Sequence, residues 1–316
     1  MKETIQKLLQ NEGENHILPF FWLHGEDETT LRTYMKIIHD ADIGAVCIES
    51  RPHPDFVGPL WWRDMDIIID EAKKLGMKIW ILDDSHFPTG FANGAMKGKP
   101  KELRRCGILS SSRDFKGHGN IKKISISRMM HKHQKPNMYS IMKKRSVKSD
   151  SLPNDEMMSV CAFAVDHSGK VIPESRTDLT EMCSGGSLTW TVPQGTWRLK
   201  VLWTSYRYGA HPDYINMTIP ESCRVLIDTV YEPHWKHYSS EFGKTIAGFF
   251  SDEPELGNGR MYSREKPGYD QDLPWSPVLA EKMRSRMGKD WKPRMFSLWG
   301  EDTGPDERAH VRFIYM

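Results

Sequence analysis

The chain has 316 residues, of which 38% are hydrophobic and 10% aromatic, enough for the core of one large domain or two ordinary ones. Its 44 basic and 42 acidic residues are mixed along the chain and leave a net charge of +2, which argues against a nucleic-acid surface. We expect neither a secretory signal nor a membrane span, because the first residues lack an apolar core and no run approaches about 18 apolar residues. Five scattered cysteines without a CxxC pair predict free thiols, no zinc site and a cytoplasmic location.

The first 100 residues alternate apolar runs of strand length with segments of helical periodicity. The runs lie at 17–23, 45–48 and 77–82, and residues 28–40 and 62–75 between them repeat apolar side chains at helical spacing. This alternation is typical of a parallel α/β sheet. The repeat of about 30 residues favours a (β/α)8 barrel of the TIM type. A doubly wound fold would instead carry a glycine-rich phosphate turn after its first strand, where this chain has LHGEDE.

Helical periodicity stops near residue 100, and short alternating segments replace it. They predict strands at 121–127, 158–165, 187–192 and 196–204. We therefore expect an inserted all-β module, a sandwich, over residues 101–215. Within it we expect a hairpin at 190–197 and a mobile loop at 131–155.

The barrel pattern is expected to resume over residues 216–316. A long helix is predicted at 218–242, then a fourth strand at 245–251, and further helices at 277–287 and 306–316. The barrel part would thus comprise 1–100 and 216–316 but only about four of eight strands. We therefore expect a C-terminally truncated chain or an incomplete barrel.

Polar or aromatic side chains follow each of the four predicted strands. The carboxyl ends of barrel strands meet at one rim, which carries the active site of such enzymes. An acid-rich, aromatic-rich rim is typical of glycoside hydrolysis, in which one carboxylic acid protonates the leaving oxygen and a second carboxylate assists. We expect Glu253 to be the general acid/base, with Asp252 and Glu255 beside it. The predicted substrate-binding residues are Trp22, His24, Glu49, Arg51, Asp83, Asp84 and His86.

Two groups of motifs resemble known glycoside hydrolases. Asp252-Glu253-Pro254 is similar to the Asn-Glu-Pro that ends the fourth strand in clan A enzymes, although that clan has Asn where this chain has Asp252. More of the chain resembles the rhamnosidase-type hydrolases of family 106. The shared pieces are Phe21-Trp22, a DD-x-x-x-P-x-G at 83–90, a W-x-V-P-x-G-x-W at 190–197 and the DEPE at 252–255. The resemblance implies that Glu253 is a catalytic carboxylate and that the β module is a sugar-binding-like sandwich.

Several alternatives stay open. The second catalytic carboxylate lies beyond residue 316 or is Glu49, Asp83 or Asp84. The protein could be a non-catalytic carbohydrate-binding protein, or a metal-dependent barrel lyase or isomerase that uses the same acids. We expect a carbohydrate partner, no nucleic acid, no membrane and no cofactor, although rim carboxylates would suit calcium. The oligomeric state is open. We expect His53 and His234 to be solvated or capping residues rather than metal ligands.

Overall fold

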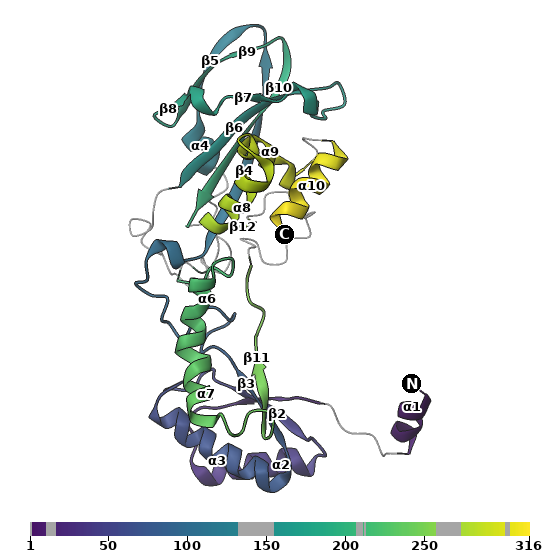
Figure 1. Ribbon diagram of the computed structural model, residues 1–316, viewed down its shortest axis with the longest axis vertical. Coiled ribbons are helices and arrows are strands. Elements are labelled where there is room, and N and C mark those ends of the chain that lie inside the picture. Colours follow the sequence, from purple (N-terminus) through teal and green to yellow (C-terminus); the bar gives the residue numbers. More distant parts are fainter. Residues whose placement is uncertain are drawn as a thin grey trace. The chain divides into compact units, whose positions relative to one another are not determined.

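The computed structural model describes residues 2–10, 17–131, 155–206, 211, 213–256, 273–300 and 304–316. The chain divides into two compact units (Figure 1). The first, which we call the parallel unit, comprises Met1–Gly98 and Cys223–Glu255. The second, the antiparallel unit, comprises Lys99–Ser222 and Leu256–Met316. A short helix, α1 (Lys2–Leu9), precedes the first strand. None of the described helices combines the length and apolarity needed to cross a membrane.

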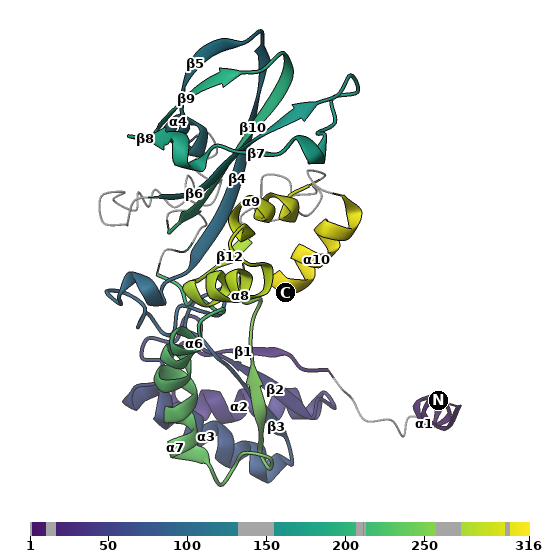
Figure 2. The ribbon, with the colours of Figure 1, turned by 45° about the horizontal axis from the view of Figure 1, so that its top comes forward.

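The parallel unit is built on a four-stranded sheet in which every neighbouring pair of strands is parallel. Its order is β1 (Phe20–Trp22), β2 (Ala45–Glu49), β3 (Lys78–Leu82) and β11 (Ile246–Phe250). The connecting helices α2 (Glu28–Asp40) and α3 (Pro59–Leu75) lie beside one another (Figure 2). The chain returns to β11 through α6 (Pro220–Leu226), a π-helical turn (Ile227–Tyr231) and α7 (Glu232–Tyr238).

Capping residues define where the helices of this unit begin and end. Asp27 caps α2, because its carboxylate accepts the backbone N–H of Thr30 at 3.0 Å. Gly76 ends α3 in the left-handed conformation, at φ 69°, which glycine adopts without steric cost. The apolar faces of the two helices, with Leu31 on α2 and Ile68 on α3 fully buried, then cover the sheet. The predicted βαβ pattern is thus present in the structure.

The sheet of the parallel unit is strongly curved. β1 and β11 are its two edge strands, which a flat sheet would hold about 14 Å apart across three strand spacings. The rings of Phe20 on β1 and Phe250 on β11 nevertheless meet edge-on, with centroids 5.4 Å apart. Gly248 leaves room for the Trp80 ring, because a Cβ at this position would lie 3.2 Å from that ring. Over the described residues the sheet stays open, so the fold is mixed α/β with several sheets and the predicted closed barrel is not found.

The antiparallel unit contains two sheets (Figure 1). The larger has the order β12 (Leu273–Trp275), β4 (Cys106–Gly117), β10 (Gly195–Ser205), β6 (Glu156–Val165) and β7 (Thr177–Asp178). The smaller has the order β5 (Asn120–Ser125), β9 (Ser187–Val192) and β8 (Cys183–Ser184). A short helix, α4 (Ile126–His131), follows β5. β9 and β10 pair with different neighbours, so the predicted hairpin at 190–197 is instead a turn between the two sheets.

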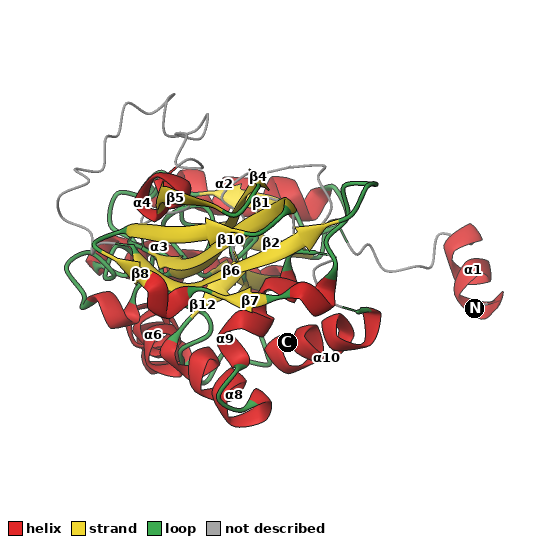
Figure 3. Ribbon diagram, turned by 90° about the horizontal axis from the view of Figure 1, so that it is seen from above, coloured by secondary structure: helices red, strands yellow, loops and turns green. Residues whose placement is uncertain are grey.

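The five-stranded sheet carries a hydrophobic core on each face. One core includes Phe115, Leu188 and Trp203 and joins the two sheets. The other includes Phe163 and residues of α8 (Pro277–Met287), α9 (Trp291–Arg294) and α10 (Pro305–Tyr315), the helices shown in red near the C-terminus in Figure 3.

The C-terminal region does not continue the barrel as expected. β12 pairs with β4, and Trp275 stacks on Trp291 with ring centroids 6.0 Å apart inside the second core. Of the expected continuation over 216–316, residues Cys223–Glu255 belong to the parallel unit and Leu256–Met316 belong to the antiparallel unit. β4 itself was not predicted, because its middle is polar and interrupts the alternation of apolar residues. Most of the predicted mobile loop, residues 132–154, lies outside the described residues.

Candidate functional site

The carboxyl edge of the parallel sheet brings three of the predicted residues into direct contact. Arg51, two residues after β2, donates from Nε and Nη2 to the two carboxylate oxygens of Glu49, each at 2.5 Å. The same Nη2 lies 2.8 Å from Oδ2 of Asp252, which follows β11. Glu49 is fully buried, whereas Arg51 and Asp252 each leave 18% of the side chain exposed. Burial opposes the charge on Arg51, but hydrogen bonds to the two carboxylates raise its pKa overall.

Asp83, the first residue after β3, is a buried carboxylate held by hydroxyl groups. Thr89 donates to one of its oxygens at 2.5 Å and Tyr231 donates to the other at 2.6 Å. Burial raises the pKa of Asp83, and the neighbouring charge of Asp84 acts in the same direction. Asp83 thus lies beneath the surface of the edge, in contact with protein groups.

Asp84 organises the loop that follows β3. Its carboxylate accepts the backbone N–H groups of Gly90, Ala92 and Asn93 at 2.9, 2.8 and 2.9 Å, and its side chain is fully buried. Ala92 and Asn93 have φ of 52° and 51°, a left-handed conformation that these hydrogen bonds stabilise. The geometry assigns Asp84 a role in shaping the loop.

The loop after β3 is tied to the segment after β11 by a reciprocal pair of hydrogen bonds. Thr89 N–H donates to the carbonyl of Asp252, and Asp252 N–H donates to Thr89 Oγ1, both at 2.9 Å. Because the same Thr89 hydroxyl donates to Asp83, Thr89 links both strand ends. Both the backbone N–H and the backbone C=O of Asp252 are therefore hydrogen-bonded to Thr89.

Glu253 differs from the acids around it. Its side chain is exposed, and within the described residues it makes no hydrogen bond and no ion pair. Its φ is +46°, a left-handed conformation that is rare for residues other than glycine. Pro254 follows it, and a residue before proline normally prefers extended backbone. Strained residues of this kind concentrate at functional sites. Glu255, two residues further, is partly buried.

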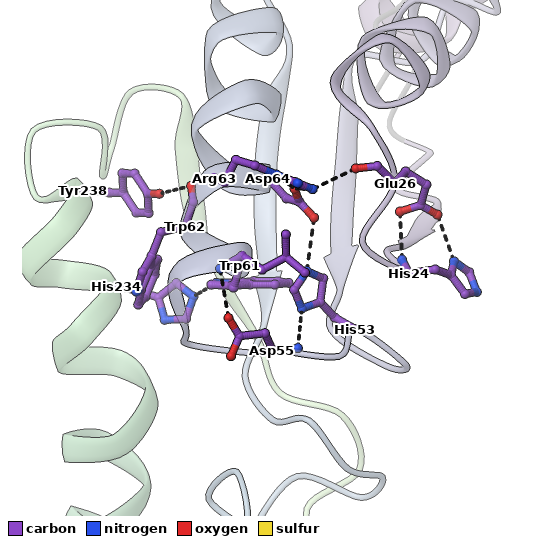
Figure 4. Close-up of polar contacts among 11 residues, drawn as sticks. His24, Glu26, His53, Asp55, Trp61, Trp62, Arg63, Asp64, His234 and Tyr238 are labelled. Atoms are coloured by element: carbon purple, nitrogen blue, oxygen red, sulfur yellow. Dashed lines mark hydrogen bonds and ion pairs between the residues drawn. The ribbon is translucent and has the colours of Figure 1, made fainter.

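The three remaining predicted residues are exposed at the same end of the sheet. Trp22 is 55% exposed and lies opposite Glu49 in the β1–β2 register. His86 contacts the Ser85 hydroxyl at 2.9 Å and the Phe91 ring. His24 instead contacts Glu26, with Nδ1 3.0 Å from its carboxylate (Figure 4). No side-chain hydrogen bond or ion pair among the described residues joins any of these three to the Glu49–Arg51–Asp252 cluster.

His53 and His234, which we expected to be solvated or capping residues, are both buried rather than solvated (Figure 4). His53 accepts the Asp55 N–H at Nδ1 and therefore donates from Nε2 to Asp64, 3.1 Å away. His234 accepts the indole N–H of Trp61 at 2.9 Å, so its Nδ1 donates to the Val230 carbonyl. Burial lowers the pKa of His234 to about 4. Each histidine is buried because both ring nitrogens have partners.

Sequence reasoning missed Thr89 and Tyr231, whose hydroxyls donate hydrogen bonds to Asp83. Thr89 stands in the DD-x-x-x-P-x-G motif, so its position was visible but its role was not. Tyr231 ends the π-helical turn before α7, a type of distortion that is frequent at functional sites. Among the described residues, no three His, Cys, Asp or Glu side chains are arranged to hold a metal ion.

Comparisons with known proteins identify no family. No family model matches the chain, and no curated protein matches it. Among solved structures, a rhamnosidase from Novosphingobium sp. PP1Y is similar over 95% of this chain, with 12% identity and a TM-score of 0.44. This chain spans 42% of that protein's length. A likeness at this level assigns neither a fold nor an activity to the chain.

Proposed function

We propose that the protein is a glycoside hydrolase whose parallel unit forms one side of a (β/α)8 barrel. The curvature that brings Phe20 and Phe250 together supports the barrel, because a closed sheet requires its strands to coil in this way. The substrate would lie at the carboxyl edge of the sheet, where Trp22 offers an exposed ring to a sugar face.

The observation that carries the proposal is the state of Glu253. It is the exposed acid at the edge that has no partner among the described residues, whereas Glu49, Asp83, Asp84 and Asp252 are all hydrogen-bonded or ion-paired. A general acid/base needs a carboxyl group that is free to reach the glycosidic oxygen. The strained backbone at Glu253 fixes the direction in which that group leaves the chain.

The other acids then have supporting roles. Arg51 holds the Asp252 carboxylate next to Glu253, where it is placed to accept a hydrogen bond from a sugar hydroxyl. Thr89 anchors the backbone of the same residue. Thr89 is in turn held by its hydrogen bond to Asp83, which also accepts one from Tyr231. These three side chains would position Asp252 without contacting the sugar.

The test is hydrolysis of a panel of aryl glycosides, including an aryl α-L-rhamnoside, by the natural protein and a Glu253→Gln variant. We expect kcat to fall by about 10²- to 10⁴-fold, the usual contribution of a general acid/base. The melting temperature should not change, because the side chain is exposed. Glu174→Gln, also on an exposed side chain, is the matched control and should keep full activity.

Two outcomes would overturn the proposal. One is full activity in Glu253→Gln. The other is oligosaccharide binding by calorimetry without turnover of any glycoside in the natural protein, which would indicate a non-catalytic carbohydrate-binding protein.

A further inference from the structure

The antiparallel unit contains a cavity of about 810 Å³, within the size range of ligand pockets. It opens where β4, β5 and α4 meet, and its polar lining is basic. The cations that line it are Arg113, Lys122, Lys123 and Arg128. Ser111 closes one side by donating its hydroxyl to the Met129 carbonyl at 3.0 Å.

Two of the four cations converge on one ring. The guanidinium of Arg113, on β4, lies 5.2 Å from the centroid of Phe115, and the ammonium of Lys122, on β5, lies 5.8 Å from the same centroid. The ring is buried and meets Trp190 edge-on, so it is held in place. Like charges that share one partner repel, and an anion between them would relieve that repulsion.

The protein does not supply that anion within its described part. No carboxylate of the described residues lies within ion-pairing distance of any of the four cations. The acid nearest in sequence, Asp114, points to the opposite face of β4 and binds Arg198 through two hydrogen bonds of 2.7 and 2.9 Å. The cavity therefore presents unneutralised positive charge.

We infer that this cavity binds an acidic oligosaccharide through its carboxylate or sulfate groups. That the ligand is an anion follows from the cavity alone, and that a sugar carries the anion rests on the proposed function. A nucleic acid is disfavoured, because single-stranded chains bind on open aromatic rings and the Phe115 ring is buried under two cations. Arginine forks suit carboxylate and sulfate oxygens, which they can bind in pairs.

The test is calorimetric titration of the full chain with a galacturonate trisaccharide, a sulfated heparin-type disaccharide, and the neutral galactose trisaccharide. We expect one or both acidic sugars to bind at least about tenfold more tightly than the neutral one, and to weaken as NaCl rises from ~50 to ~500 mM. The two acidic probes identify carboxylate or sulfate as the group recognised.

The variants locate the binding. The double variant Arg113→Gln/Arg128→Gln alters two exposed side chains and should weaken the acidic sugar about tenfold or more. Lys116→Gln, on the opposite face of β4, is the control and should bind as the natural protein does. Circular dichroism checks that both variants fold.

Four results would overturn the inference: no binding of either acidic sugar, equal binding of the neutral one, unchanged affinity in the double variant, or tighter binding of single-stranded DNA than of either acidic sugar in the same titration. Hydrolysis measured with Glu253→Gln is a separate readout, so failure at this cavity leaves the proposed activity standing. If the acidic sugar binds at this cavity but the protein hydrolyses no glycoside, the proposed hydrolase activity is wrong and the proposed binding site stands.

Discussion

The guanidinium of Arg51 lies 2.8 Å from the carboxylate of Asp252, although 200 residues, among them the Lys99–Ser222 part of the antiparallel unit, separate the two in sequence. The same guanidinium carries both hydrogen bonds to the buried carboxylate of Glu49. One cation thus bridges carboxylates at the ends of two strands, β2 and β11, which are not neighbours in the sheet.

Replacing Arg51 by Met should destabilise the protein by about 3–5 kcal/mol, because it leaves the carboxylate of Glu49 buried without a partner. Urea unfolding measures the loss. The double variant Glu49→Gln/Arg51→Met should recover part of it, since the unpaired charge is gone. Arg224→Met is the control: Arg224 pairs with Asp228 and Glu232 at the surface, so its loss should cost at most about 1 kcal/mol. If Arg51→Met is as stable as the natural protein, the buried Glu49–Arg51 ion pair does not contribute as expected.

Tyr231→Phe should destabilise the protein more at neutral pH than at pH 4. Burial raises the pKa of Asp83 above its ordinary 3.8, so the folded state keeps this proton at a pH where the unfolded state has lost it. The contribution of Asp83 to stability is therefore lost as pH rises from near 4 through its folded pKa. Without the hydrogen bond from Tyr231 the pKa of Asp83 rises further. The stability difference between the natural protein and Tyr231→Phe therefore grows as pH rises.

Urea unfolding of the natural protein and Tyr231→Phe between pH 4 and 8 measures this deficit, which we expect to reach about 1–3 kcal/mol. Tyr315→Phe is the control, because that hydroxyl donates to the neutral carbonyl of Pro274 and its loss should not depend on pH. A deficit for Tyr231→Phe that is equal at all pH values would show that Asp83 is not the group involved.

His234 should make the protein less stable as pH falls from 6.5 toward 4. Burial lowers its pKa to about 4, so the unfolded chain takes up a proton in this window and the folded one does not. The free energy of unfolding therefore rises with pH between 4 and 6.5. The contribution of His234 to this rise is on the order of 3 kcal/mol. In His234→Gln this part of the slope should disappear. His167→Gln, on an exposed turn, is the control and should keep the slope.

Gly248→Ala should destabilise the protein by about 1–3 kcal/mol, because the added methyl would lie 3.2 Å from the Trp80 ring in a packed face. The control is Gly44→Ala, where no heavy atom lies within 4 Å of the added Cβ. Thermal unfolding of the two variants checks the difference. Equal melting temperatures would mean that Trp80 can move away without cost.

The sequence predicts the parallel unit well because its strands are continuously apolar and their ends are polar. All four predicted strands pair in parallel, and the acids expected at one edge are at one edge. The role of Asp84 could not be predicted, because it depends on three backbone N–H groups brought together by the loop conformation. The apolar pattern indicates which polar residues follow a strand, but not whether their side chains face solvent.

The partners of the C-terminal helices could not be predicted either. The pattern in residues 277–287 indicates a helix, but an apolar face packs equally well on a parallel or an antiparallel sheet. Their assignment to the antiparallel unit depends on β12, a three-residue strand that contains Pro274 and is too short to be recognised. The burial of His53 and His234 could not be predicted for a similar reason: their partners Asp64 and Trp61 come from α3, and only folding brings them together.

The order of strands in the parallel sheet has a consequence for synthesis on the ribosome. β3 ends at Leu82, but its partner β11 begins at Ile246, after the Lys99–Ser222 part of the antiparallel unit. At ~5–20 residues per second, β3 remains an edge strand for on the order of 10 s, with unpaired backbone N–H and C=O groups open to other chains. The antiparallel unit is complete only after β12 and the last helices emerge, so neither unit can finish before the other has begun. We expect nascent chains that stop before residue 246 to aggregate unless a chaperone covers β3.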